Sequence, residues 1–78
     1  DLDGARALLE QCLALNRRTR GDRHPNTATT LNDLGLIALQ QGDLAGARAR
    51  IEQAIDIYRQ VLGDGHPAVA ASLNALAH

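Results

Sequence analysis

Apolar residues recur with a helical period between residues 25 and 41. They follow one another at spacings of three, three, one and three, at Ala28, Leu31, Leu34, Gly35 and Ala38. Such spacing places them on one face of a helix, whereas a strand would need strict alternation. Pro25 suits the first helical position with His24 as the N-cap, and Gly42 suits the turn that ends a helix. We therefore predict a helix that begins at Pro25 and ends before Gly42.

A second helix is predicted between Asp43 and Gly63. Asp43 is a favourable N-cap beside the positive end of the helix dipole. The apolar stripe of this segment consists of Leu44, Ala47, Ile51, Ala54, Ile55, Tyr58 and Leu62. On its outer side Arg48 and Glu52 stand four residues apart, as do Arg6 and Glu10 near the start of the chain, and we expect both to form ion pairs.

The chain repeats itself with a period of 42 residues. The stretch "GDRHPNTATTLNDL" at residues 21 to 34 returns as "GDGHPAVAASLNAL" at residues 63 to 76, and 17 of the 36 overlapping pairs are identical. When the two predicted helices are shifted by 42 residues, one backward and one forward, they predict a further helix at each end of the chain. Their apolar positions are Leu2, Ala5, Leu9, Cys12 and Leu13 in the first helix, and Ala70, Leu73 and Leu76 in the last.

We name a helix that follows His-Pro an A helix, and a helix that follows Gly-Asp or stands at the equivalent position a B helix. The order along the chain is then B–A–B–A, and the short connections force consecutive helices to be antiparallel. The predicted fold class is all-α, built from antiparallel helical hairpins. Residues 1–23 hold a B helix, residues 24–65 one complete repeat, and residues 66–78 an A helix.

These residues resemble the tetratricopeptide repeat, in particular the 42-residue kind found in kinesin light chains. The resemblance rests on "HPNTATTLNDLGLIALQQGDLAGARARIEQAIDIYRQVLGDGHP", with "VLG..HP" among its most specific parts. Ala38 departs from the family pattern, which usually has tyrosine there, and Gly46 replaces a common glutamate. The resemblance implies that the hairpins stack into an α-α superhelix.

The resemblance also implies a concave surface, lined by A helices, that binds peptides of partner proteins. The residues expected on it are Thr29, Asn32, Leu36 and Gln40, with Ala71, Asn74 and His78 as counterparts in the last helix. Asn32 and Asn74 are the strongest candidates, because an amide offers a donor and an acceptor to a peptide backbone. Alternatively, these asparagines hold a neighbouring turn or are simply solvated. Leu36 would add apolar contact, and Leu39 would either do the same or pack in the core.

Composition and charge narrow the possible partners. The net charge is −1, and the eight basic residues, all arginine, are interspersed with nine acidic ones. Binding to nucleic acid requires clustered basic residues, so we expect this chain not to bind nucleic acid. No apolar run approaches the roughly 18 to 20 residues that span a bilayer, and no signal peptide is visible, so we expect no membrane partner and a cytoplasmic location. Because the chain has no methionine, we expect it to be a segment of a longer protein.

Catalysis and metal binding find little support in the sequence. His24 and His66 each precede a proline at a helix start, where a capping role suffices, and one repeat separates them, too far to share a zinc ion. Cys12 lies on an apolar stripe, and we expect it to be a small buried side chain. No glycine-rich phosphate loop or serine-centred motif is present. We therefore expect no enzyme activity, no cofactor and no metal.

Two functions from different classes remain. The favoured one is a non-catalytic protein–protein interaction module that binds a peptide or partner protein on the concave face. The alternative is a structural spacer or a self-association segment of a larger protein. The ends of the chain favour self-association, because the first helix is a B helix without its A helix and the last is an A helix without its B helix.

Overall fold

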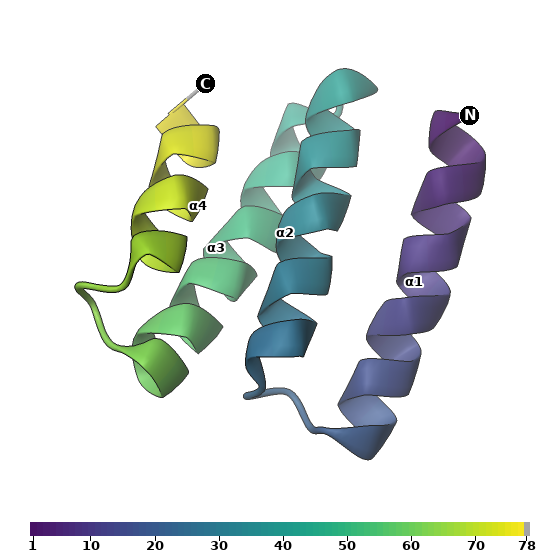
Figure 1. Cartoon of the computed structure of the whole chain (residues 1–78). Helices are drawn as coiled ribbons and strands as arrows, with labels where there is room; N and C mark the ends of the chain where they lie inside the picture. Colours follow the sequence, from purple (N-terminus) through teal and green to yellow (C-terminus); the bar gives the residue numbers. More distant parts are fainter. Residues whose placement is uncertain (78) are drawn as a thin grey trace.

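The computed structural model describes residues 1–77 of the chain as four α-helices. They are α1 (Leu2–Thr19), α2 (Pro25–Gln40), α3 (Leu44–Leu62) and α4 (Pro67–Ala77). Consecutive helices run antiparallel, with α1 and α4 at opposite ends of the row and α2 and α3 packed together between them (Figure 1). The predicted all-α fold of helical hairpins in the order B–A–B–A is confirmed for these residues.

The helix ends follow the chemistry of the residues that flank them. His24 Nδ1 accepts a hydrogen bond from the backbone N–H of Asn26 at 3.0 Å, and His66 Nδ1 accepts one from Ala68 N–H at the same distance. Asp43 caps α3 by accepting from the N–H of Gly46 at 2.9 Å. These caps satisfy N–H groups that have no partner inside the helix. Glycines with positive φ end the first three helices, at Gly21, Gly42 and Gly63.

The core is built mainly from side chains of α2 and α3, with one residue each from α1 and α4. Its buried members are Leu13, Ala28, Leu31, Leu34, Ile51, Ala54, Ile55, Tyr58 and Val69. Tyr58 is the only aromatic residue of the chain. Because the other core side chains are smaller, the helices must approach closely to fill the interior without voids.

The closest approach between α2 and α3 occurs at Gly35. A Cβ atom at this position would lie 2.5 Å from Cγ1 of Ile51 and 3.2 Å from the carbonyl oxygen of Ala47. Neither the buried isoleucine nor the helix backbone has room to move. Gly35 therefore sets the distance between the two central helices.

Polar contacts connect α1 to the repeat that follows it. Glu10 forms an ion pair with Arg50 of α3 at 2.8 Å, and Arg6 donates to Oε1 of Gln41 at 3.1 Å. Of the two ion pairs expected within helices, Arg48 with Glu52 is present at 3.6 Å. The expected pair of Arg6 with Glu10 is wrong, because both side chains find partners in the next hairpin instead.

The structure corrects several expected core positions. Cys12 is exposed rather than buried, because no helix within residues 1–77 covers that side of α1. The same cause leaves Ala5 exposed on α1 and Ala70 and Leu73 exposed on α4. The remaining expected core residues that are exposed are Leu2, at the start of α1, and Leu44 and Leu62, at the two ends of α3.

Leu31 and Leu73 offer a matched test of the packing, because they occupy equivalent positions one repeat apart. Leu31 is 0% exposed and Leu73 is 43% exposed. Leu31→Ala should lower the free energy of unfolding by about 2–5 kcal/mol, since it leaves a cavity, and Leu73→Ala by less than about 1 kcal/mol. Urea melts followed by circular dichroism measure both, and equal losses would contradict the assigned helix faces.

Gly35→Ala should also destabilise the protein, by about 1–3 kcal/mol, because the new methyl group forces α2 and α3 apart. Gly4→Ala is the control, since its Cβ would meet only the exposed side chain of Asp1, with the nearest atom at 3.3 Å. That change should be neutral or stabilising by up to about 1 kcal/mol, because alanine favours helix. If thermal melts show the melting temperatures of both variants shifting in the same direction, that result would argue against a close approach of α2 and α3 at Gly35.

Candidate functional site

One side of α2 is covered by no other helix and carries a row of residues spaced three or four apart. We call this row the α2 face, and it consists of Thr29, Asn32, Asp33, Leu36 and Gln40. Thr29, Leu36 and Gln40 are exposed, with Leu36 at 38%, whereas Asn32 and Asp33 are half-buried at its edges. The four residues that the sequence proposed for a binding surface thus share one side of α2, as their spacing requires.

Asn32 stands where α2 meets α4. Its Oδ1 accepts a hydrogen bond from the hydroxyl of Ser72 at 3.2 Å, and Ser72 is buried. The bond fixes the amide plane, and Nδ2 donates no hydrogen bond to any residue between 1 and 77. Asn32 thus contacts the neighbouring helix rather than a turn, and it keeps two N–H donors directed away from that bond.

Thr29 and Tyr58 form a second polar contact at this face. Their hydroxyl oxygens lie 2.8 Å apart, and the Thr29 hydroxyl is also 3.0 Å from the carbonyl oxygen of Pro25. If Thr29 donates to Pro25, the Tyr58 hydroxyl must donate to Thr29. Sequence reasoning placed Tyr58 only in the core. Its ring is indeed buried, but its hydroxyl reaches the edge of the α2 face.

Asp33 is the residue that sequence reasoning missed. It is the only charged residue in α2, and it stands four positions after Thr29 and three before Leu36. Burial raises the pKa of its carboxyl group above the ordinary value of 3.8. The helical spacing alone could have found it, but the repeat comparison did not, because α4 has Ala75 at the equivalent position.

The remaining candidates are dispersed. Asn74 and Ala71 are exposed on α4, one repeat from Asn32 and Thr29, and no hydrogen bond joins Asn74 to Asn32. Leu39 is half-buried and packs against the core. His78, expected as the counterpart of Leu36, lies outside the described residues.

The two histidines at helix starts already have a structural role, since the Nδ1 atom of each accepts a backbone hydrogen bond. Across residues 1–77, no three side chains from His, Cys, Asp and Glu come together as a metal site would need. In the same part of the chain, no helix has the length and apolar character to cross a membrane.

The whole chain matches the model of one known protein family. The model of the tetratricopeptide repeat matches residues 1–60 and again residues 34–78, so the two matches together cover the chain. No curated protein matches it. Proteins of this family generally use such hairpins to contact peptides and other proteins. The chain belongs to the tetratricopeptide repeat family.

Proposed function

We propose that the α2 face, together with Asn74 of α4, binds a peptide segment of a partner protein. The observation that carries this proposal is the half-buried Asn32 amide, which Ser72 fixes through its oxygen while its N–H groups remain available. A fixed amide can pair with a peptide backbone whatever the peptide's side chains, and little entropy is lost because the amide is already oriented. The exposed Leu36 adds apolar contact nearby.

The charge of the α2 face favours a basic residue in the bound segment. The carboxyl group of Asp33 is partly desolvated, and neither α2 nor α4 supplies a cation. A lysine or arginine of the peptide would provide the missing counter-charge, and the partly desolvated setting would strengthen that attraction. The preferred partner is therefore a segment with a basic side chain beside its clamped backbone.

The sequence supports a family subtype, a cellular location and a class of partner for this binding module. The 42-residue period and the "VLG..HP" phrase support the subtype found in kinesin light chains. We infer a non-catalytic module of the cytoplasm that needs no cofactor. Its balanced charge supports a protein partner rather than nucleic acid or a membrane.

Asn32→Ala should weaken peptide binding by about 1–2 kcal/mol, which is roughly a 5- to 30-fold rise in Kd. Asn74→Ala should have a similar effect if the peptide spans both A helices. The probe is a peptide selected on the wild-type protein from a random phage library, and calorimetric titration gives its Kd.

Two variants control for indirect effects of these changes. Ser72→Ala removes the partner hydroxyl but keeps the Asn32 amide, so it reports how much affinity depends on fixing that amide. Gln53→Ala removes an exposed amide from α3, outside the α2 face, and should leave the Kd unchanged. Unchanged affinity in both asparagine variants would overturn the proposal in favour of a spacer.

Asp33→Asn should raise the stability of the free protein at neutral pH. Because the folded-state pKa of Asp33 lies above 3.8, its ionisation costs stability once the pH exceeds that raised pKa, and the cost disappears as the pH falls below 3.8. Urea melts from below pH 3.8 to neutral pH should show that Asp33→Asn is more stable than the wild type only at the higher pH values. Asp56→Asn, an equal change of charge at an exposed site, should shift stability by less than about 0.5 kcal/mol. In the peptide selection, Asp33→Asn should also lose the preference for lysine and arginine.

A further inference from the structure

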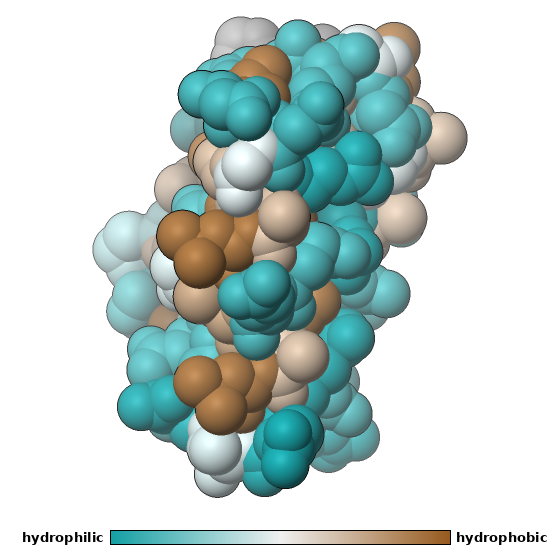
Figure 2. Space-filling model, turned by 90° about the vertical axis from the view of Figure 1, so that its right-hand side faces the viewer, coloured by the Kyte–Doolittle hydropathy of each residue, from teal (hydrophilic) through white to brown (hydrophobic). Residues whose placement is uncertain are grey.

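Half of the eight arginines of the chain are concentrated at the turn between α1 and α2. Residues 17–23 read "RRTRGDR", with four arginines and one aspartate, and all four arginines are exposed. In Figure 2, which faces α1, hydrophilic side chains lie on both sides of the lower end of this helix, where it leads into the turn. We call the four side chains, Arg17, Arg18, Arg20 and Arg23, the basic turn.

Most of the charge of the basic turn has no counter-charge within the fold. Arg17 forms an ion pair with Asp22 at 3.2 Å. Arg20 donates to a neutral side-chain amide oxygen at 3.1 Å, which leaves its charge unbalanced. Arg18 and Arg23 form no ion pair with any residue between 1 and 77. Three of the four positive charges are therefore available to a partner.

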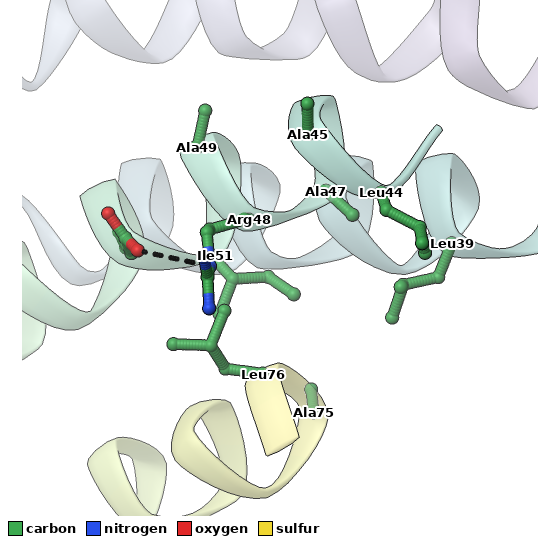
Figure 3. A pocket seen from close by; sticks show the side chains of 10 residues that line it. Leu39, Leu44, Ala45, Ala47, Arg48, Ala49, Ile51, Ala75 and Leu76 are labelled. Atoms are coloured by element: carbon green, nitrogen blue, oxygen red, sulfur yellow. Dashed lines mark ion pairs between the residues drawn. The ribbon is translucent and has the colours of Figure 1, made fainter. Parts of the chain in front are cut away.

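The other four arginines of the chain are held by partners within the fold. The pairs are Arg6 with Gln41, Arg48 with Glu52, Arg50 with Glu10, and Arg59 with Asp64. Figure 3 shows one of these ion pairs as a dashed line at Arg48. Outside residues 17–23, these four arginines stand against eight acidic residues. The basic turn is therefore an isolated positive patch on a chain that is otherwise acidic.

The turn between α3 and α4 shows that the fold does not need this charge. It repeats the ion pair of the first turn, because Arg59 lies 3.5 Å from Asp64, and both turns begin with a glycine of positive φ, Gly21 and Gly63. The three unpaired arginines are absent from it. Where the first turn has Arg18, Arg20 and Arg23, the second has Gln60, Leu62 and Gly65. Arg17 thus belongs to the shared turn, whereas the other three arginines do not.

Neighbouring repeats do not cover these turn positions. The first turn is followed in the row by α3 and α4, and its arginines are exposed. The second turn is preceded in the row by α1 and α2, and Gln60, Leu62 and Gly65 are exposed as well. Exposure at these positions is therefore a property of the repeat and does not depend on where the turn stands in the row.

The fold gains little from the additional arginines. Cations in the last turn of a helix complement its dipole, which gives Arg17 and Arg18 a structural role in α1. Arg23, however, stands directly before His24, the N-cap of α2, where a cation meets the positive end of the helix dipole. Like charges gathered in one turn also repel one another. Departures from local rules without a structural gain are expected at functional positions.

We propose that the basic turn binds an acidic segment of a partner protein, one that carries several aspartates or glutamates. An arginine guanidinium group is permanently charged and offers a planar pair of N–H donors that matches a carboxylate. The Cα atoms of Arg18 and Arg23 are at most about 17 Å apart along the chain, a span that roughly five extended peptide residues cover. This binding goes beyond the proposed function, because it uses the turn and no residue of the α2 face.

A short acidic segment fits this patch better than a nucleic acid does. The negative charge of a nucleic acid continues along its whole length, so a bound strand would also meet the excess of acidic residues outside residues 17–23. A short peptide can place its carboxylates on the basic turn alone. The charge distribution therefore favours a protein partner.

The two sets of arginines supply a matched test. The probe is a fluorescein-labelled hexa-aspartate peptide, and fluorescence anisotropy gives its Kd. Arg18→Gln, Arg20→Gln and Arg23→Gln together should raise the Kd roughly 10-fold. Arg6→Gln, Arg48→Gln and Arg59→Gln together remove the same net charge from paired positions, and should raise it less than about 3-fold. A rise in salt from about 50 to about 150 mM should weaken binding to the wild type.

The second turn allows the converse change. Gln60→Arg, Leu62→Arg and Gly65→Arg together place arginines at the equivalent positions, and a Cβ atom at Gly65 would meet nothing within 4 Å. In the variant that lacks the three arginines of the first turn, these changes should restore the Kd of the wild type to within about 3-fold. Circular dichroism verifies that each variant is folded.

Four results would overturn the proposal. One is the absence of hexa-aspartate binding at millimolar peptide and physiological salt. Another is an equal loss in the two glutamine variants, since net charge alone would then explain the binding. A third is the failure of the second-turn arginines to restore binding in a folded protein. The last is tighter binding of a single-stranded oligonucleotide of equal charge, which would point to nucleic acid instead.

The basic turn and the α2 face can be tested apart. Asn32→Ala should leave the Kd for hexa-aspartate unchanged, because Asn32 lies outside residues 17–23. The arginine variants, in turn, leave every residue of the α2 face in place. Either proposal can therefore fail while the other stands.

Discussion

Each helix of this fold has two apolar sides, and only a neighbouring helix can cover them. The apolar core is aliphatic apart from one tyrosine, so no large side chain can reach across an uncovered face. Coverage is complete where α2 and α3 meet, around Leu31 and Ile51, and it fails on the outer sides of α1 and α4. The closeness of the two central helices at Gly35 follows from the same constraint, because small side chains fill space only when backbones approach.

The local features could be predicted because they depend on residues close in sequence. The cap formed by His24, the turn at Gly42 and the period of the apolar stripe each involve only a few neighbouring positions. The partner of Glu10 could not be predicted in this way, since Arg50 is 40 residues away and reaches it only once the hairpins stack. Burial of Cys12 was wrongly expected for the same reason. Burial depends on what lies opposite a residue, not on the residue itself.

The residues of the candidate site could be predicted only in part by comparing the two repeats. Comparing repeats drew attention to Asn32, because asparagine returns at position 74, and it passed over Asp33, which has alanine as its counterpart. Comparing repeats finds only what two repeats share, so a residue present in one repeat alone has to be found from its place on the helix. Tyr58 is another such residue. Where it bonds to Thr29, its counterpart Asn16 donates to Thr30.

The hydrogen bond between Asn32 and Ser72 connects the stacking of the helices with the proposed peptide binding. The α2 face lies on a side of α2 that no neighbouring helix covers, yet Ser72 belongs to the next A helix and orients the Asn32 amide from there. Asn74 would need the same support from an A helix beyond α4. Packing of α4 beside α2 therefore does more than bury apolar surface, because it also orients the amide on which the proposed peptide binding depends.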